Sequence, residues 1–181
     1  MNRQTFFLQQ FRPAPETAGP RLAVGGSIGR HDGELFLQYQ VSGDIKDLTI
    51  PRSNRPGSRR HGLWRESCFE CFLGMKDSRR YWEINLAASG DWNVYSFSGY
   101  RQDMAEEKAF QALPSSCHAT RDELRLDLIV DLTRIVREGH ALEIGISSVL
   151  KLRNGDITLW SLCHPGPEAD FHHRSGFLLA K

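Results

Sequence analysis

The chain has 181 residues, of which 40% are hydrophobic and 25% are charged. These proportions are ordinary for one globular domain and exclude a disordered, fibrous or coiled-coil chain. Basic and acidic residues nearly cancel, with 23 against 22, so the chain lacks the overall charge that draws proteins to nucleic acid or anionic membranes. We therefore expect a single domain over residues 1–181, with neither nucleic acid nor a membrane as its partner.

The N-terminal apolar run Phe6-Phe7-Leu8 is too short for the core of a signal peptide. No apolar stretch approaches the roughly 20 residues that span a bilayer. We expect residues 5–11 to form a first strand and the protein to be cytoplasmic. The cysteines should then be free thiols, at positions Cys68, Cys71, Cys117 and Cys163.

Segments of strand length, rich in β-branched and aromatic residues, recur along the chain. They cover residues 5–11, 33–43, 66–75, 80–89, 91–100, 123–132, 141–152, 156–164 and 175–181. Turn signals lie at Gly33, Gly43, Gly74, residues 89–91, Gly139 and residues 154–156. Asn154-Gly155 is the strongest of them and predicts a hairpin between the last two long strands.

Only two stretches have a helical pattern. Residues 103–113 are one, and the other is residues 131–139, where Asp131 is a candidate cap and Gly139 a candidate end. So many strands with so little helix predict an all-β fold, a two-sheet antiparallel β-sandwich of jelly-roll type with one or two short helices.

Alternation along residues 66–73 places Cys68, Glu70 and Phe72 on one face of a strand and Cys71 on the other. The two cysteines therefore point apart. We expect them to form neither a disulfide with each other nor a shared metal site.

The next strand places Trp82 in the core and Glu83 and Asn85 on the opposite face. If the two strands pair, Glu70 lies near Glu83 and Asn85. Two carboxylates and an amide on one sheet surface are suited to hydrogen-bonding hydroxyl groups. The alternative is a set of solvated outer-face residues.

Two tryptophans complete the candidate site. Trp64 precedes the strand that carries Glu70, and Trp160 shares a face with Thr158 and Leu162. Aromatic rings stack on the apolar faces of sugar rings, whose hydroxyls need fixed polar partners. Core packing is the rival explanation for each tryptophan.

The order of motifs from Trp64 to the C-terminus resembles the DOMON-like superfamily. More narrowly, it resembles the bacterial DOMON-like proteins related to family 9 carbohydrate-binding modules. The matching segments are residues 63–72, 81–85 and 89–92, Trp160, His164-Pro165 and residues 170–177.

The resemblance implies a sugar sandwiched between Trp64 and Trp160, with Glu70, six residues after the first tryptophan, bonded to its hydroxyls. Other DOMON domains hold heme through methionine and histidine. The candidates for that role here are Met75, Met104, His172 and His173. None of the matched motifs places a methionine opposite a histidine, and we expect no cofactor.

The leading hypothesis is a non-catalytic domain that binds a sugar or sugar-containing small molecule through Trp64, Glu70, Glu83, Asn85 and Trp160. The alternatives are a glycoside hydrolase that uses Glu70 and Glu83 as its carboxylate pair, a heme-binding module and a protein-interaction module. Two segments remain open. The basic stretch from Ile50 to Leu63 is either a solvated loop or a lid beside Trp64, and the segment of His172 and His173 is either a pinned loop or a metal site.

Overall fold

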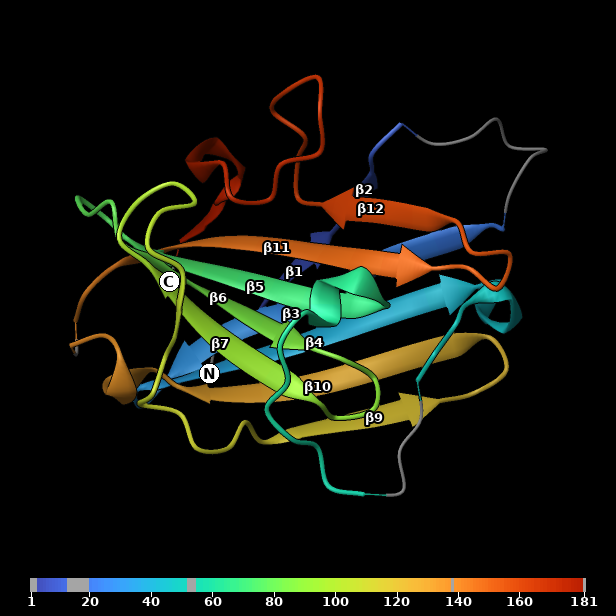
Figure 1. Ribbon diagram of the computed structural model, residues 1–181, viewed down its shortest axis with the longest axis horizontal. Coiled ribbons are helices and arrows are strands. Elements are labelled where there is room, and N and C mark those ends of the chain that lie inside the picture. The colour runs from blue at the N-terminus through green and yellow to red at the C-terminus, as the bar shows by residue number, and fades with distance from the viewer. Residues whose placement is uncertain (1–2, 13–19, 52–54, 138, 181) are drawn as a thin grey trace.

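The structure is a computed structural model in which residues 3–12, 20–51, 55–137 and 139–180 are described. Two antiparallel sheets pack face to face, which confirms the predicted all-β sandwich (Figure 1). The strands are β1 (Arg3–Phe7), β2 (Gln9–Gln10), β3 (Leu22–His31), β4 (Glu34–Gly43), β5 (Cys68–Met75), β6 (Tyr81–Leu86), β7 (Trp92–Phe97), β8 (Ala105–Glu106), β9 (Ser115–Ala119), β10 (Glu123–Asp131), β11 (Leu142–Lys151), β12 (Ile157–Ser161) and β13 (Leu179–Ala180). The short 3₁₀-helices are η1 (Ile45–Asp47), η2 (Leu63–Arg65), η3 (Leu132–Arg134) and η4 (Arg174–Gly176).

The five-stranded sheet has the order β1-β3-β4-β10-β9. The eight-stranded sheet has the order β2-β12-β11-β5-β6-β7-β8, with β13 added beside β11. In Figure 1 the strands β5, β6, β7 and β11 of the larger sheet lie in front of the smaller one. The predicted first strand divides between the two sheets, because β1 pairs with β3 and β2 pairs with β12.

The core lies between the sheets and follows strict alternation. Along β4 the residues Leu35, Leu37, Tyr39 and Val41 are buried, and their neighbours are more exposed. The larger sheet contributes Phe69 and Cys71 from β5 and similar alternate residues from its other strands. Burial of these apolar side chains is the main source of stability for such a sandwich.

The hairpin predicted at Asn154-Gly155 is confirmed, since it joins the antiparallel pair β11 and β12. The predicted cap is also present: the Asp131 carboxylate accepts a hydrogen bond from the main-chain N–H of Thr133, at the start of η3. Gly74, however, is not in a turn. It lies inside β5.

The helix predicted over residues 103–113 is wrong, because this segment contains β8 and irregular turns. Tertiary contacts override the local pattern here. The carbonyls of Glu107 and Phe110 accept hydrogen bonds from the Arg59 side chain, and the Glu107 carboxylate accepts one from Trp82 Nε1 at 3.0 Å. Two strands were also not predicted, glycine-rich β3 and polar β9. Among the described residues, no helix is long and apolar enough to cross a bilayer.

Candidate functional site

The outer face of the eight-stranded sheet, which points away from the other sheet, is covered by protein. Every residue of β6 is buried, on both faces of the strand, and so is every residue of β5 except Met75. Three segments cover this face: η2, the loop of residues 98–104 and the C-terminal segment of residues 163–178. The prediction that Glu83 lies opposite Trp82 is confirmed, but neither is exposed.

Two glycines make room for the C-terminal segment. A Cβ atom at Gly145 would lie 2.7 Å from the Phe177 ring, and one at Gly74 would lie 2.2 Å from the Arg174 guanidinium. Neither distance is sterically possible. Glycines inside strands often mark such close approaches, and here they let Arg174 and Phe177 lie directly on the sheet.

Arg174 fixes this segment through several hydrogen bonds. Its Nη2 donates to the Met75 carbonyl at 2.7 Å and to Glu143 Oε2 at 2.6 Å, and its Nε also donates to Glu143 at 3.0 Å. Its guanidinium also lies over the Phe177 ring, 5.2 Å from the ring centroid. The C-terminal segment is therefore a packed part of the fold.

An outer aromatic cluster fills much of the space under the covering segments. Its members are Phe72, Tyr81, Tyr95, Phe97 and Phe177, with Trp64 and Phe171 packed against them. Tyr81 and Phe97 stack with their ring centroids 4.7 Å apart. Trp64 packs edge-on against His61 and Tyr95.

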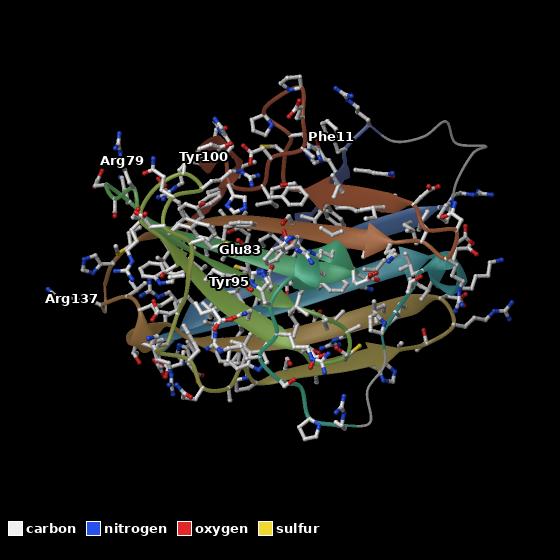
Figure 2. All side chains as sticks on the ribbon, in the orientation of Figure 1. Phe11, Arg79, Glu83, Tyr95, Tyr100 and Arg137 are labelled. Carbon is white, nitrogen blue, oxygen red and sulfur yellow. The ribbon has the colours of Figure 1, made fainter. Side chains whose placement is uncertain are left out.

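A cavity of about 440 Å³ remains beside this cluster. Its aromatic and apolar walls and its polar groups come from residues that are far apart in the chain. The lining consists of Trp64, Glu70, Glu83, Phe97, Arg101, Met104, Val149, Leu159, Ala169, Phe171 and His172. Figure 2 shows Glu83 and Tyr95 over the middle of the sheet.

Glu70 is one of two acidic groups in the cavity lining. Its side chain is buried, and its Oε2 accepts a hydrogen bond from Ser147 Oγ, on the neighbouring strand β11, at 2.9 Å. Burial, together with the charge of nearby Glu83, raises the pKa of Glu70 to about 8. Desolvation disfavours the charged form of a carboxyl group.

Glu83 is the other acidic group in the lining. Its Oε1 accepts a hydrogen bond from Asn85 Nδ2 at 2.8 Å. Burial raises the pKa of Glu83 to about 7, and the hydrogen bond from Asn85 and the charge of Arg101 oppose this rise. The two carboxyl groups are thus buried near each other, and their protonation is coupled. With pKa values of about 8 and about 7, the pair still holds protons near neutral pH.

His172 stands beside the glutamates as a neutral group. Burial and the charge of Arg101 lower the pKa of His172 to about 4. Its Nδ1 lies 2.8 Å from the Tyr81 hydroxyl, which itself accepts the Arg101 main-chain N–H at 3.2 Å. These hydrogen bonds are consistent if the Tyr81 hydroxyl donates to His172 Nδ1 and the imidazole proton is on His172 Nε2. His172 Nε2 lies 3.8 Å from Glu83 Oε2. A neutral imidazole at that distance forms no ion pair with Glu83.

Asp170 joins two of the covering segments. Its carboxylate accepts hydrogen bonds from Tyr100 Oη at 2.6 Å, from Arg101 Nη2 at 2.9 Å and from the main-chain N–H of His172 at 3.1 Å. Burial alone would raise the pKa of Asp170, but these bonds and the Arg101 charge lower it. The Asp170 clamp therefore carries a full negative charge that neutralises Arg101.

The structure brings together three of the five predicted site residues. Trp64, Glu70 and Glu83 line the cavity, and Asn85 supports Glu83 from a fully buried position. Trp160 does not belong to this group. It is 6% exposed, packs into the core between the sheets and donates from Nε1 to Thr158 Oγ1 at 2.9 Å.

The error at Trp160 lies in the choice of face. Thr158, Trp160 and Leu162 do share a face of β12, but it is the core face, and Leu159 from the opposite face lines the cavity. Sequence reasoning also missed Phe97, Arg101 and Phe171. Phe97 ends β7, where alternation with Tyr95 was the available signal for its face. Arg101 and Phe171 lie in covering segments without strand periodicity, so no pattern could orient their side chains.

The two cysteines of β5 lie on opposite faces, as predicted, and both are free. Cys71 packs into the core, and Cys68 Sγ donates to Asn85 Oδ1 at 3.6 Å on the outer face. The expected separation of the sulfurs by alternation is confirmed.

The basic stretch from Ile50 to Leu63 includes residues 52–54, which lie outside the described residues. Most of the described remainder is exposed, but Arg59 and His61 contact aromatic side chains. Arg59 lies over the Trp92 ring, 4.4 Å from its centroid, and donates to Asn93 Oδ1 at 2.6 Å. His61 contacts Trp64 and Tyr95, so this segment positions an aromatic wall of the cavity.

Local hydrogen bonds hold the segment of His172 and His173 in place, which agrees with its interpretation as a pinned loop. The His173 side chain caps η4 by accepting from the Ser175 N–H. Within the described ranges, no group of three His, Cys, Asp or Glu residues is arranged to hold a metal ion. Met104 and His172 both line the cavity, but the two ring nitrogens of His172 face Tyr81 and Glu83, which does not fit an axial heme ligand.

No family model matches the sequence, and no curated protein is similar to it at a significant level. Solved structures are similar in fold. A protein from Bacteroides uniformis, described as a "putative carbohydrate-binding protein", matches with a TM-score of 0.67 and 13% identity over 97% of this chain and 84% of that one. A family 9 carbohydrate-binding module from Caldicellulosiruptor kristjanssonii, in complex with cellotriose, matches with a TM-score of 0.50 and 12% identity over 87% of this chain and 71% of that one. The chain therefore has the β-sandwich fold of these carbohydrate-binding proteins.

Proposed function

We propose that this chain is a non-catalytic binding domain for a sugar or sugar-containing small molecule, which occupies the cavity on the outer face of the eight-stranded sheet. The observation that carries the proposal is the pairing of aromatic walls with buried acceptor groups. Trp64, Phe97 and Phe171 supply apolar ring surface, and Glu70 and Glu83 supply carboxyl oxygens in the same cavity. Sugar rings require both kinds of contact.

The similarity in fold to carbohydrate-binding proteins supports the proposal. So does the volume of about 440 Å³, which lies within the range of small-molecule sites. The finer assignment, to the bacterial DOMON-like proteins related to family 9 modules, remains part of this proposal and rests on the motif order from Trp64 onward.

A binding role is favoured over glycoside hydrolysis because of where the glutamates lie. A glycosidase places its two carboxyl groups on either side of the scissile bond. Glu70 and Glu83 instead rise from neighbouring strands of one sheet, which forms the floor of the cavity. We expect no hydrolysis of nitrophenyl glycosides, and turnover of any of them would contradict the binding role.

Calorimetric titration with mono- and disaccharides tests the proposal directly. Trp64→Ala removes a wall of the cavity and should weaken sugar binding by about 1 kcal/mol or more. Phe7→Ala is the matched control, because Phe7 is an aromatic residue 80% exposed on the other sheet. If Trp64→Ala and Phe7→Ala bind every sugar equally well, the sugar does not occupy this cavity.

A further inference from the structure

The charge of the cavity lining restricts the ligand further than its shape does. Four titratable side chains line the cavity: Glu70, Glu83, Arg101 and His172. Arg101 is neutralised by the Asp170 clamp at 2.9 Å, and His172 is neutral because its pKa is lowered. The two glutamates are left as the uncompensated acidic groups of the described lining.

Apart from Arg101, whose charge lowers the pKa of Glu83 but is paired with Asp170, the groups that surround the glutamates on other elements supply no positive charge. Tyr39 reaches from the five-stranded sheet, Cys68 lies on β5, Tyr81 on β6 and Tyr95 on β7. Burial raises the pKa of each of these groups, so all four are neutral at physiological pH. A further positive charge beside the glutamates, beyond that of Arg101, has to come from the ligand.

Each glutamate also presents a free oxygen. Glu70 Oε1 has no hydrogen bond to any described residue, although the Glu70 side chain is 3% exposed and lines the cavity. Glu83 Oε2 has only His172 Nε2 near it, at 3.8 Å. Because these two oxygens are left without a protein donor in a cavity that both glutamates line, a ligand with several donors at one point is suited to bond both.

The aromatic residues that share the cavity with the glutamates suit a cation as well. Trp64, Phe97 and Phe171 present ring surface to the cavity, and ammonium groups are attracted to the faces of aromatic rings. A protonated amine offers three donors, a positive charge and a size that fits between two carboxylates.

We propose that the sugar bound in this cavity carries a free, protonated amino group, whose ammonium lies between the carboxylates of Glu70 and Glu83. This inference rests on the sugar-binding function proposed above and adds the chemical class of the sugar. An N-acetylated sugar lacks the charge and brings a carbonyl oxygen toward the carboxylates, so it should bind less well than the free amine.

Matched sugars test the inference by calorimetry at pH 7. The panel pairs D-glucosamine, D-galactosamine and D-mannosamine with their neutral parents and their N-acetyl derivatives. For the pair that binds best, the amino sugar should bind at least about tenfold more tightly than the neutral sugar, and the N-acetyl form should lose that advantage. Binding of the amino sugar should also release protons, which shows as a heat that depends on the ionisation enthalpy of the buffer.

Two isosteric variants locate the effect. Glu70→Gln and Glu83→Gln should each reduce affinity for the amino sugar by about tenfold or more and largely abolish its preference over the neutral parent. Glu123→Gln, on the surface of the five-stranded sheet, is the control and should leave the preference unchanged. Should a site variant fail to fold, the sugar preference and proton release of the unaltered protein still decide the question.

The outcomes separate the two proposals. If neutral sugars bind as tightly as amino sugars, the ammonium inference is wrong and the sugar-binding function stands. If no sugar of either kind binds, both are wrong. If ethanolamine, an amine without a sugar ring, binds as tightly as the best amino sugar, the sugar-binding function is wrong and the cavity recognises amines alone.

Discussion

The longest strands of the two sheets each have 10 residues, but the sheets differ in what lies on their outer faces. Along β10 of the five-stranded sheet, buried and more exposed residues alternate, as expected where water covers one face. Along β11 of the larger sheet, the seven consecutive residues from Ile144 to Leu150 are all buried. The same backbone geometry thus yields a solvated surface on one sheet and a second buried layer, with a cavity, on the other.

The comparison shows where polar residues have chemical consequences. Gln38, Gln40 and Asp127 on the five-stranded sheet pair with each other or with neighbours at the surface, where water competes for every bond. Glu70 and Glu83 on the larger sheet are shielded from water, and burial raises their pKa values.

The largest effect is expected at Trp160, because replacing it distinguishes a role in the core from a role in the binding site. Trp160→Ala should lower the free energy of unfolding by about 3–5 kcal/mol, because it empties a large volume in the core. Chemical denaturation measures this, with Ile157→Ala as the control, since Ile157 is 49% exposed on the same strand. Lost sugar binding with unchanged stability would instead place Trp160 in the site.

A second test compares how residues of the two sheets affect the pH dependence of stability. The pKa values of Glu70 and Glu83 in the folded protein, about 8 and about 7, lie above the ordinary value of 4.5. Their contribution to stability is therefore complete below about pH 4.5 and is lost as the pH rises through 7 and 8. The double variant Glu70→Gln, Glu83→Gln should be more stable than the original protein at pH 8, by on the order of 2 kcal/mol.

Denaturation curves collected from pH 5 to pH 8 check this difference. Phe7→Ala on the five-stranded sheet, which alters no ionisable group, should leave the pH dependence unchanged. A double variant that loses stability equally at every pH would show that the glutamates are ionised and well solvated in the folded protein.

A smaller effect is expected at the Asp170 clamp. Asp170→Ala removes the acceptor shared by Tyr100, Arg101 and the His172 N–H. Because the Arg101 side chain is 52% exposed, we expect a loss of only about 1 kcal/mol in stability. Hydrogen exchange should quicken in residues 98–104 and 163–173, whereas Asp122→Ala, in the turn before β10, should leave both segments unchanged. Equal exchange in the two variants would mean that the clamp does not hold the covering segments.

The smallest effect is expected on the outer face of the five-stranded sheet. Gln40 is exposed, and its Nε2 donates to Glu123 Oε2 at 3.0 Å. Gln40→Ala should change the free energy of unfolding by less than about 0.5 kcal/mol. A cost well above 1 kcal/mol would show that this face, too, is covered by structure.

Alternation in the sequence was enough to predict the sandwich and to assign opposite faces to Trp82 and Glu83. It was not enough to identify the core face where both faces carry apolar residues. On β12, Leu159 and Trp160 are equally plausible core residues by hydropathy, and only the packing of the whole sheet decides between them. The glycines of β3 likewise concealed a strand, because glycine carries no β-propensity.

The covering of the outer face could not be predicted because it depends on contacts between distant, irregular segments. Gly74 and Gly145 were the available signal, since a glycine inside a strand often marks a close approach. That signal locates a contact but does not identify the partner. Neither Arg174 nor Phe177 has a pattern that points to these glycines.

The packing of residues 163–178 onto the sheet also constrains the order in which the parts of the protein can fold. The hydrogen bond from Arg174 to the Met75 carbonyl joins residues 99 apart in the sequence, and such distant contacts form late in folding. While the chain is being synthesised, the outer aromatic cluster stays exposed to water until residues 163–178 have emerged from the ribosome. Chains interrupted before that point would expose aromatic surface of the kind that drives aggregation.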